Sequence, residues 1–122
     1  VMGYEFWPQS LAATIRRAWE VTGGRLPIVV TENGIGTDDD DQRIRYTRAA
    51  LEGVLDCLAE GIDVRGYTYW SLLDNFEWAF GYGPRFGLGE VDRRTFVRTP
   101  KPSAAWYGSV ARANALPAPG DA

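Results

Sequence analysis

The sequence contains no histidine among its 122 residues. Catalysis by Ser-His or Cys-His pairs and metal sites with histidine ligands are therefore excluded within this chain. The single cysteine, Cys57, lies in a helical pattern, so there is no disulfide framework, and we interpret it as a small packed side chain. No metal site and no cofactor are predicted.

Long apolar runs and concentrations of basic residues are also absent. No stretch reaches the length of a membrane-spanning segment, and the net charge of −3 comes without the basic cluster typical of nucleic-acid binding. We therefore expect neither a membrane nor a nucleic acid as partner. The chain begins with valine and has no signal-peptide pattern, which we interpret as a piece of a longer reading frame. The single cysteine slightly favours a cytoplasmic location.

Helical and strand patterns alternate along the chain. Helices are predicted over 10–24, with Ser10 as N-cap, over 42–61 and over 103–114, and strands over 28–31 and 66–70. A hairpin over 90–98 is expected to turn at 92–95. The buried face of the middle helix is predicted from its spaced apolar residues, Ile44, Leu51, Val54, Leu55 and Leu58. The aspartates at 38–41 lack the spacing of a calcium loop and are interpreted as a solvated loop that caps this helix.

This order of elements is typical of an α/β fold with parallel strands. Two parallel strands alone leave unpaired edges and uncovered faces. The chain is therefore predicted to be the end of a larger fold and incomplete on its own. The Pro/Ala/Gly-rich residues 115–122 are expected to form a flexible tail after a structured segment over 1–114.

The stretch "VVTENGIG" places a carboxylate at the end of an apolar, β-branched strand. Glu32 follows the run "PIVV" and precedes Asn33-Gly34, a turn signal. In parallel α/β folds, the carboxyl ends of the strands are where active sites are built. Glu32 is therefore a candidate catalytic residue, with an ordinary carboxylate in a turn as the alternative.

A second strand end leads into "YTYWSLLDNFEWAFGYGPRFGL", a loop in which aromatic and charged residues alternate. Aromatic rings can pack on the apolar faces of sugars, while a carboxylate such as that of Glu77 can bind two adjacent hydroxyls. We interpret the loop as a sugar site. The alternative is a minor hydrophobic core under a long loop.

The segments "TENG", "YWSLLDNFEW" and "GYGPRFGL" together resemble the C-terminal part of family 1 glycoside hydrolases, the β-glucosidase group. The resemblance extends from "YEFWPQSL" to "VDRRTFVRTPKPSAAWY" and so covers nearly the whole chain. It implies the last two strands, with their helices, of a (β/α)8 TIM barrel, a fold that usually needs about 250 residues or more. The expected partner is a β-glycoside or oligosaccharide substrate, and the N-terminal part of the barrel is missing.

The resemblance also implies a role for each matching residue. Glu32 resembles the catalytic nucleophile of this retaining family, and Trp70 the platform under the sugar. Glu77 resembles the carboxylate that grips two hydroxyls, Trp78 a donor to a neighbouring hydroxyl, and Phe86 an aromatic wall. The implied reaction is hydrolysis of terminal β-D-glucosyl or related bonds by double displacement.

The chain departs from the family pattern in two ways. The acid/base glutamate of the family lies in an "NEP" motif that this sequence lacks, so the isolated chain is expected to be inactive. The aspartate run also replaces a loop that often carries histidine, which leaves the aglycone preference open. Two alternatives remain: Glu77 as the acid/base residue, and a vestigial, non-catalytic carbohydrate-binding product.

Overall fold

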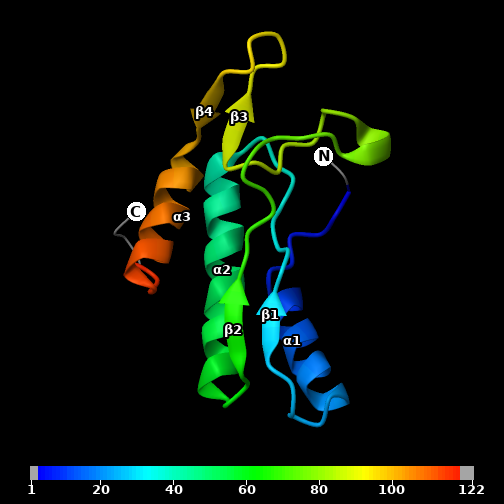
Figure 1. Ribbon diagram of the computed structural model, residues 1–122, viewed down its shortest axis with the longest axis vertical. Helices are drawn as coiled ribbons and strands as arrows, with labels where there is room; N and C mark the ends of the chain where they lie inside the picture. The colour runs from blue at the N-terminus through cyan, green and yellow to red at the C-terminus, as the bar shows by residue number, and fades with distance from the viewer. Residues whose placement is uncertain (1–2, 119–122) are drawn as a thin grey trace.

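A computed structural model describes residues 3–118 (Figure 1). Of the predicted tail, residues 119–122 lie outside the described part. The elements in chain order are α1 (Gln9–Val21), β1 (Ile28–Val30), α2 (Asp40–Ala59), β2 (Val64–Tyr67), the short 3-10 helix η1 (Trp78–Phe80), β3 (Gly89–Val91), β4 (Arg98–Pro100) and α3 (Pro102–Ala113).

The two predicted buried-type strands pair in parallel. In β1 and β2, Ile28 lies opposite Val64 and Val30 opposite Tyr67, with a register shift between Ile28 and Val29. Strands β3 and β4 form the predicted antiparallel hairpin, and the Asp92 carboxylate accepts hydrogen bonds from the amides of Arg94 and Thr95 in its turn. The parallel order confirms the α/β prediction.

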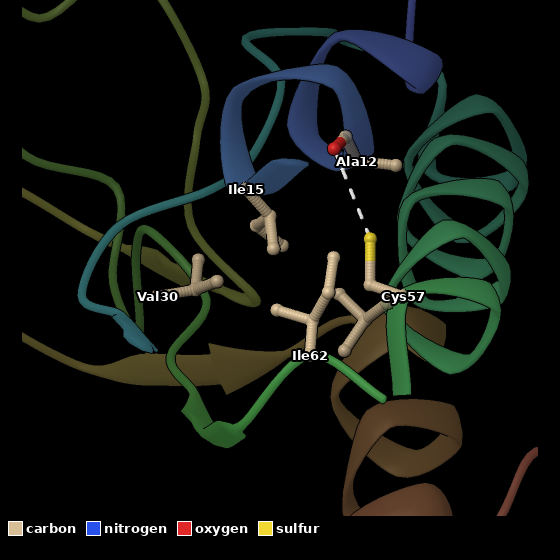
Figure 2. Close-up of a cluster of buried hydrophobic side chains, with 6 residues drawn as sticks. Ala12, Ile15, Val30, Cys57 and Ile62 are labelled. Atoms are coloured by element: carbon tan, nitrogen blue, oxygen red, sulfur yellow. Dashed lines mark hydrogen bonds between the residues drawn. The ribbon is translucent and has the colours of Figure 1, made fainter. Parts of the chain in front are cut away.

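The hydrophobic core lies between α1, α2 and one face of the parallel sheet (Figure 2). Ala12 and Ile15 come from α1, Cys57 from α2 and Val30 from β1, and Ile62 closes the cluster. Cys57 is completely buried, with its Sγ 3.8 Å from the carbonyl oxygen of Ala12. Burial raises the pKa of the Cys57 thiol. The interpretation of Cys57 as a small packed side chain is confirmed.

Two helix boundaries differ from the prediction. Ser10 is not the N-cap of α1; Pro8 is, and the Ser10 hydroxyl donates to the Trp7 carbonyl from inside the first turn. Helix α2 begins at Asp40 because the Asp39 side chain accepts a hydrogen bond from the Gln42 amide, so the aspartate run does cap this helix. Gly23 and Gly24, both with positive φ, follow the end of α1 as expected.

The predicted buried face of α2 is partly wrong. Leu55 and Leu58 are 49% and 44% exposed, whereas the buried positions are Arg43, Tyr46, Thr47, Ala50, Val54 and Cys57. Helix α1 packs on the side of α2 that carries Val54 and Cys57, which leaves Leu55 and Leu58 uncovered. The leucines line an open apolar groove with residues of β2 and α3.

The second strand also lies earlier than predicted, over Val64–Tyr67 rather than 66–70. Beyond Tyr67 the chain leaves the regular ladder, although it stays beside the segment that follows β1. The Trp70–Ser71 peptide bond is cis. Because β2 ends at Tyr67, Trp70 belongs to the loop that leaves the strand.

Candidate active site

The site begins where the chain leaves the carboxyl ends of β1 and β2, which lie at the same end of the sheet (Figure 1). The Thr68 amide donates to the Val30 carbonyl (2.8 Å), and the Trp70 amide donates to the Asn33 carbonyl (2.9 Å). The two segments thus stay paired past the end of the regular strands. This pairing brings the loop of Glu32 beside Trp70.

Two glycines after Glu32 allow the aromatic loop to approach closely. A Cβ atom on Gly34 would lie 2.0 Å from the carbonyl oxygen of Trp70, and a Cβ atom on Gly36 would lie 2.9 Å from the Phe86 ring. No side chain fits at either position without displacing its neighbour. Trp70 and Phe86 therefore pack directly against the loop that carries Glu32.

Asn33 is fixed by a half-buried tyrosine. The Tyr67 hydroxyl donates to the Asn33 side-chain oxygen at 2.8 Å. Burial, reinforced by the neighbouring Tyr107 and Tyr69, raises the pKa of Tyr67 well above its usual range, so the phenol keeps its proton and remains a donor. The Glu32 side chain is exposed and makes no hydrogen bond or ion pair within residues 3–118.

The aromatic loop is closed at its base by a nearly buried ion pair. Lys101 donates to both carboxylate oxygens of Asp74 at 2.9 Å and to the Gly87 carbonyl, and the Gly87 amide donates back to Asp74. The side chains of Lys101 and Asp74 are 11% and 14% exposed. Asp74 thus binds a backbone group of the loop and has a structural role.

Glu77 and Trp78 lie at the far part of this loop. The Glu77 amide donates to the Gly81 carbonyl across the turn that contains η1, and Trp78 is 81% exposed. Phe76 packs edge-on against Tyr82, and Arg93 lies over the Tyr82 ring. No hydrogen bond or ion pair among the described residues joins Glu77 or Trp78 to the loop of Glu32. The structure thus brings Trp70 and Phe86, but not these two residues, against that loop.

Sequence reasoning missed Arg43 and Tyr69, two buried residues that support the site. Arg43 donates to the carbonyls of Thr37 and Arg85, and Tyr69 donates to the Phe86 carbonyl. Burial raises the pKa of Tyr69 to about 12, although the nearby Arg43 opposes this shift. The available signal was the helical spacing of positions 43, 46, 47, 50, 54 and 57, which continues the buried face of α2 into its first turn.

Within residues 3–118, no three His, Cys, Asp or Glu side chains gather as a metal site would need. No helix in the same range is long and apolar enough to cross a membrane.

Comparison with known proteins gives the family. The family model for glycosyl hydrolase family 1 matches residues 2–116 of the sequence. The chain belongs to this family. It is 44% identical to a β-galactosidase of Sulfolobus acidocaldarius, over 94% of the chain and 23% of that protein. It is 46% identical to a bifunctional β-D-glucosidase/β-D-fucosidase of Bifidobacterium breve, over 87% of the chain and 26% of that protein.

Solved structures of family members superpose on the chain closely. The β-glycosidase BGL167 is 59% identical with a TM-score of 0.89, over 99% of this chain and 29% of that one. The family 1 β-glucosidase from Thermotoga maritima is 36% identical with a TM-score of 0.90, over 96% of this chain and 28% of that one. These structures confirm the predicted fold class: the chain is part of a (β/α)8 barrel and does not close a barrel itself. It spans about a quarter of the length of its curated relatives.

Proposed function

We propose that this family 1 chain is part of a retaining β-glycosidase of the β-glucosidase type, with Glu32 as its nucleophile. The observation that carries the proposal is the packing of Trp70 and Phe86 against the two glycines that follow Glu32. This arrangement places the carboxylate at a strand end, in a loop that contacts the Trp70 backbone and the Phe86 ring, and Trp70 itself is 40% exposed. A sugar ring stacked on an aromatic face would present its anomeric carbon to such a carboxylate.

The proposed reaction is a double displacement. Glu32 attacks the anomeric carbon while an acid protonates the leaving oxygen, and water then hydrolyses the glycosyl-enzyme intermediate. Retaining enzymes place the two carboxyl groups about 5 Å apart. We propose that the acid/base glutamate comes from the part of the barrel outside this chain, and that Glu77 and Trp78 bind hydroxyls of the sugar.

The proposed substrate is a β-glycoside or an oligosaccharide with a terminal β-glycosyl group. Relatives are named β-glucosidase, β-galactosidase and β-D-fucosidase. The Thermotoga maritima enzyme has been solved with deoxynojirimycin and with azafagomine, which are sugar-like inhibitors. The named activities share the β linkage and differ in the sugar, so the proposal specifies the β-configured linkage and not one sugar.

The test is azide rescue in the full-length protein. Glu32→Ala should lose hydrolysis of an aryl β-glucoside by several orders of magnitude, because the covalent step is removed. Azide should restore turnover by attacking the anomeric carbon from the vacated space. Since only one displacement then occurs, the product should be the inverted α-glycosyl azide, identified by NMR.

Glu77→Ala is the matched control. It should weaken both ground-state and transition-state contacts with the sugar hydroxyls, shift the preference among sugars, and gain nothing from azide. If azide rescued Glu77→Ala with the α-glycosyl azide as product and left Glu32→Ala inactive, the roles proposed for the two carboxylates would be reversed.

A further inference from the structure

Arg43 is the most completely buried charged residue in the described chain, with 1% of its surface exposed. It lies in the first part of α2 and is not one of the proposed catalytic or binding residues. One terminal nitrogen donates to the Asp40 carboxylate at 2.6 Å. The other donates to two backbone carbonyls, that of Thr37 at 2.7 Å and that of Arg85 at 2.6 Å.

These two carbonyls belong to the two halves of the candidate site. Thr37 ends the loop that starts with Glu32, and Arg85 immediately precedes Phe86. The Thr37 amide also donates to the Arg85 carbonyl at 3.0 Å. Arg43 therefore joins the loop of the proposed nucleophile to the segment of the proposed aromatic wall.

The guanidinium is itself held in place from a third direction. Its partner Asp40 accepts hydrogen bonds from the Ser103 amide and hydroxyl at 2.7 and 2.8 Å, at the start of α3. Burial alone would raise the pKa of Asp40, but the bonds from Ser103 and the contact with Arg43 bring it below its usual value. The pair is thus ionised and fixed to both α2 and α3.

Stability alone is a poor explanation for this arrangement. A buried ion pair often contributes less than a well-packed apolar pair of similar volume would, because both charges lose their hydration. The Nε of Arg43 is also buried without a partner among the described residues, which adds a desolvation cost. What an apolar side chain cannot supply is a planar set of donors that fixes two carbonyls at a defined separation.

We propose that Arg43 is a positioning residue, which holds the loop of Glu32 and the segment of Phe86 at the separation that the glycosylation step requires. The inference rests on the proposed function. Gly36 lies close to the Phe86 ring across this junction, so a shift of either segment moves the loop of Glu32 relative to Phe86. Misplacement of a reacting group by about 1 Å can cost on the order of 100-fold in rate.

The experiment uses the full-length protein and a 2-deoxy-2-fluoro-β-glucoside with a good leaving group, which traps the glycosyl-enzyme. The first-order inactivation rate constant at saturating probe reports the glycosylation step in folded molecules only. We expect this constant to fall about 10- to 100-fold in Arg43→Met. The probe should be attached to Glu32 in both the wild type and the variant.

Two controls separate positioning from loss of stability. Arg45→Met makes the same substitution on the same helix, but Arg45 is 62% exposed. Val54→Ala opens the buried core between α1 and α2 away from the two loops. Both controls should keep the wild-type inactivation rate constant, and Val54→Ala should do so even with a lower melting temperature.

Arg43→Lys provides a second route if Arg43→Met does not fold. Lysine keeps the charge beside Asp40, but its single nitrogen cannot reproduce the fork, so a smaller fall in the same constant is expected. If Arg43→Met folds, an unchanged inactivation rate constant in that variant would overturn the inference. If only Arg43→Lys folds, an unchanged inactivation rate constant in Arg43→Lys would overturn it. A fall of the same size in Val54→Ala would overturn it as well. A wild type that is not labelled would instead contradict the proposed function.

Discussion

Gly34 and Gly36 have no side chain at the two points where the aromatic loop comes closest to the loop of Glu32. The obstacles differ, because Gly34 faces the backbone carbonyl of Trp70 and Gly36 faces the ring of Phe86. A ring can shift by a few tenths of an ångström more easily than a hydrogen-bonded backbone. The tolerance of each position to a methyl group therefore reports how rigidly the site is built.

Gly34→Ala in the full-length protein should reduce kcat/KM for an aryl β-glucoside by about 100-fold or more, because Trp70 must move. It should also lower the free energy of unfolding by about 1–3 kcal/mol, as overpacked positions do. Gly36→Ala should have a smaller effect on both quantities. Gly108→Ala in α3 is the matched control, since its new methyl group would meet only the flexible Arg112 side chain. Activity equal to the wild type in Gly34→Ala would show that the close approach is not needed.

The Asp40 carboxylate makes stability depend on pH in a predictable direction. Its pKa in the folded state lies below the ordinary value of 3.8, because hydrogen bonds from Ser103 and the Arg43 contact outweigh burial. A lowered carboxyl pKa contributes stability that is fully present above the unfolded value and is lost as pH falls through the folded one. In the full-length protein, Asp40→Asn should therefore lower the melting temperature at pH near 6, and the deficit should shrink as the pH falls toward about 3.

Asp41→Asn is the control for this experiment, because Asp41 is the exposed neighbour on the same turn. It should have little effect on the melting temperature at either pH. A deficit in Asp40→Asn that stays constant between the two pH values would contradict the assignment of a lowered pKa.

At the scale of elements, the loop from Asp74 to Gly87 depends on one ion pair at its base. Lys101 comes from the residue before α3 and holds both ends of the loop through Asp74 and the Gly87 carbonyl. This pair is mostly buried. Arg16 and Glu60 also form an ion pair at hydrogen-bond distance, but their side chains are 41% and 47% exposed, respectively. Removal of one partner from a buried pair leaves an uncompensated charge.

Lys101→Met should therefore cost about 3–5 kcal/mol of unfolding free energy, measured by urea denaturation of the full-length protein. Arg16→Met, the same kind of change in the exposed pair, should leave the free energy of unfolding nearly unchanged, because solvent screens that pair. The double variant Asp74→Asn/Lys101→Met should regain part of the loss, because no unpaired charge remains. Equal costs for Lys101→Met and Arg16→Met would refute a special role of the buried pair.

The elements also show how far the sequence could predict the structure. Periodicity was sufficient for three helices, two parallel strands and a hairpin, because each has a regular apolar pattern or a turn signal. It was not sufficient for the buried face of α2, since burial of Arg43 depends on Asp40, on the nearby Thr37 carbonyl and on the Arg85 carbonyl, which is distant in sequence. Likewise, the strand pattern in the sequence continues through Trp70, but β2 ends at Tyr67 and Trp70 belongs to the aromatic loop.

The sequence likewise predicted only part of the candidate site. Glu32, Trp70 and Phe86 were identified from motifs, and the structure brings their segments into contact. The contacts of Glu77 and Trp78 with a sugar stay a prediction. Arg43 and Tyr69 could not be assigned as supports of the site, since the groups that tie them to the aromatic loop are the backbone carbonyls of Arg85 and Phe86, which carry no residue-specific signal.

At the scale of the whole molecule, the described residues leave large apolar surfaces uncovered. The parallel sheet has only β1 and β2, so each strand has one unpaired edge. Val29, on the face of the sheet turned away from the helices, is 56% exposed, and Leu55 and Leu58 line the open groove beside β2. Unpaired edges and apolar faces of this kind promote association between chains.

We therefore expect the isolated 122-residue chain to self-associate, aggregate or form a molten state rather than a stable monomer. Sedimentation at several concentrations should show a mass that rises with concentration, and heating should give no sharp transition. The same preparation should hydrolyse an aryl β-glucoside far more slowly than about 1 per second, because the proposed acid/base residue is not in the chain. The matched measurement is the full-length protein in the same buffer, which should be active and melt cooperatively. A monomeric isolated chain with a sharp melt would contradict the expectation drawn from its open faces, and ordinary turnover by that chain would contradict the proposal that the acid/base group lies outside it.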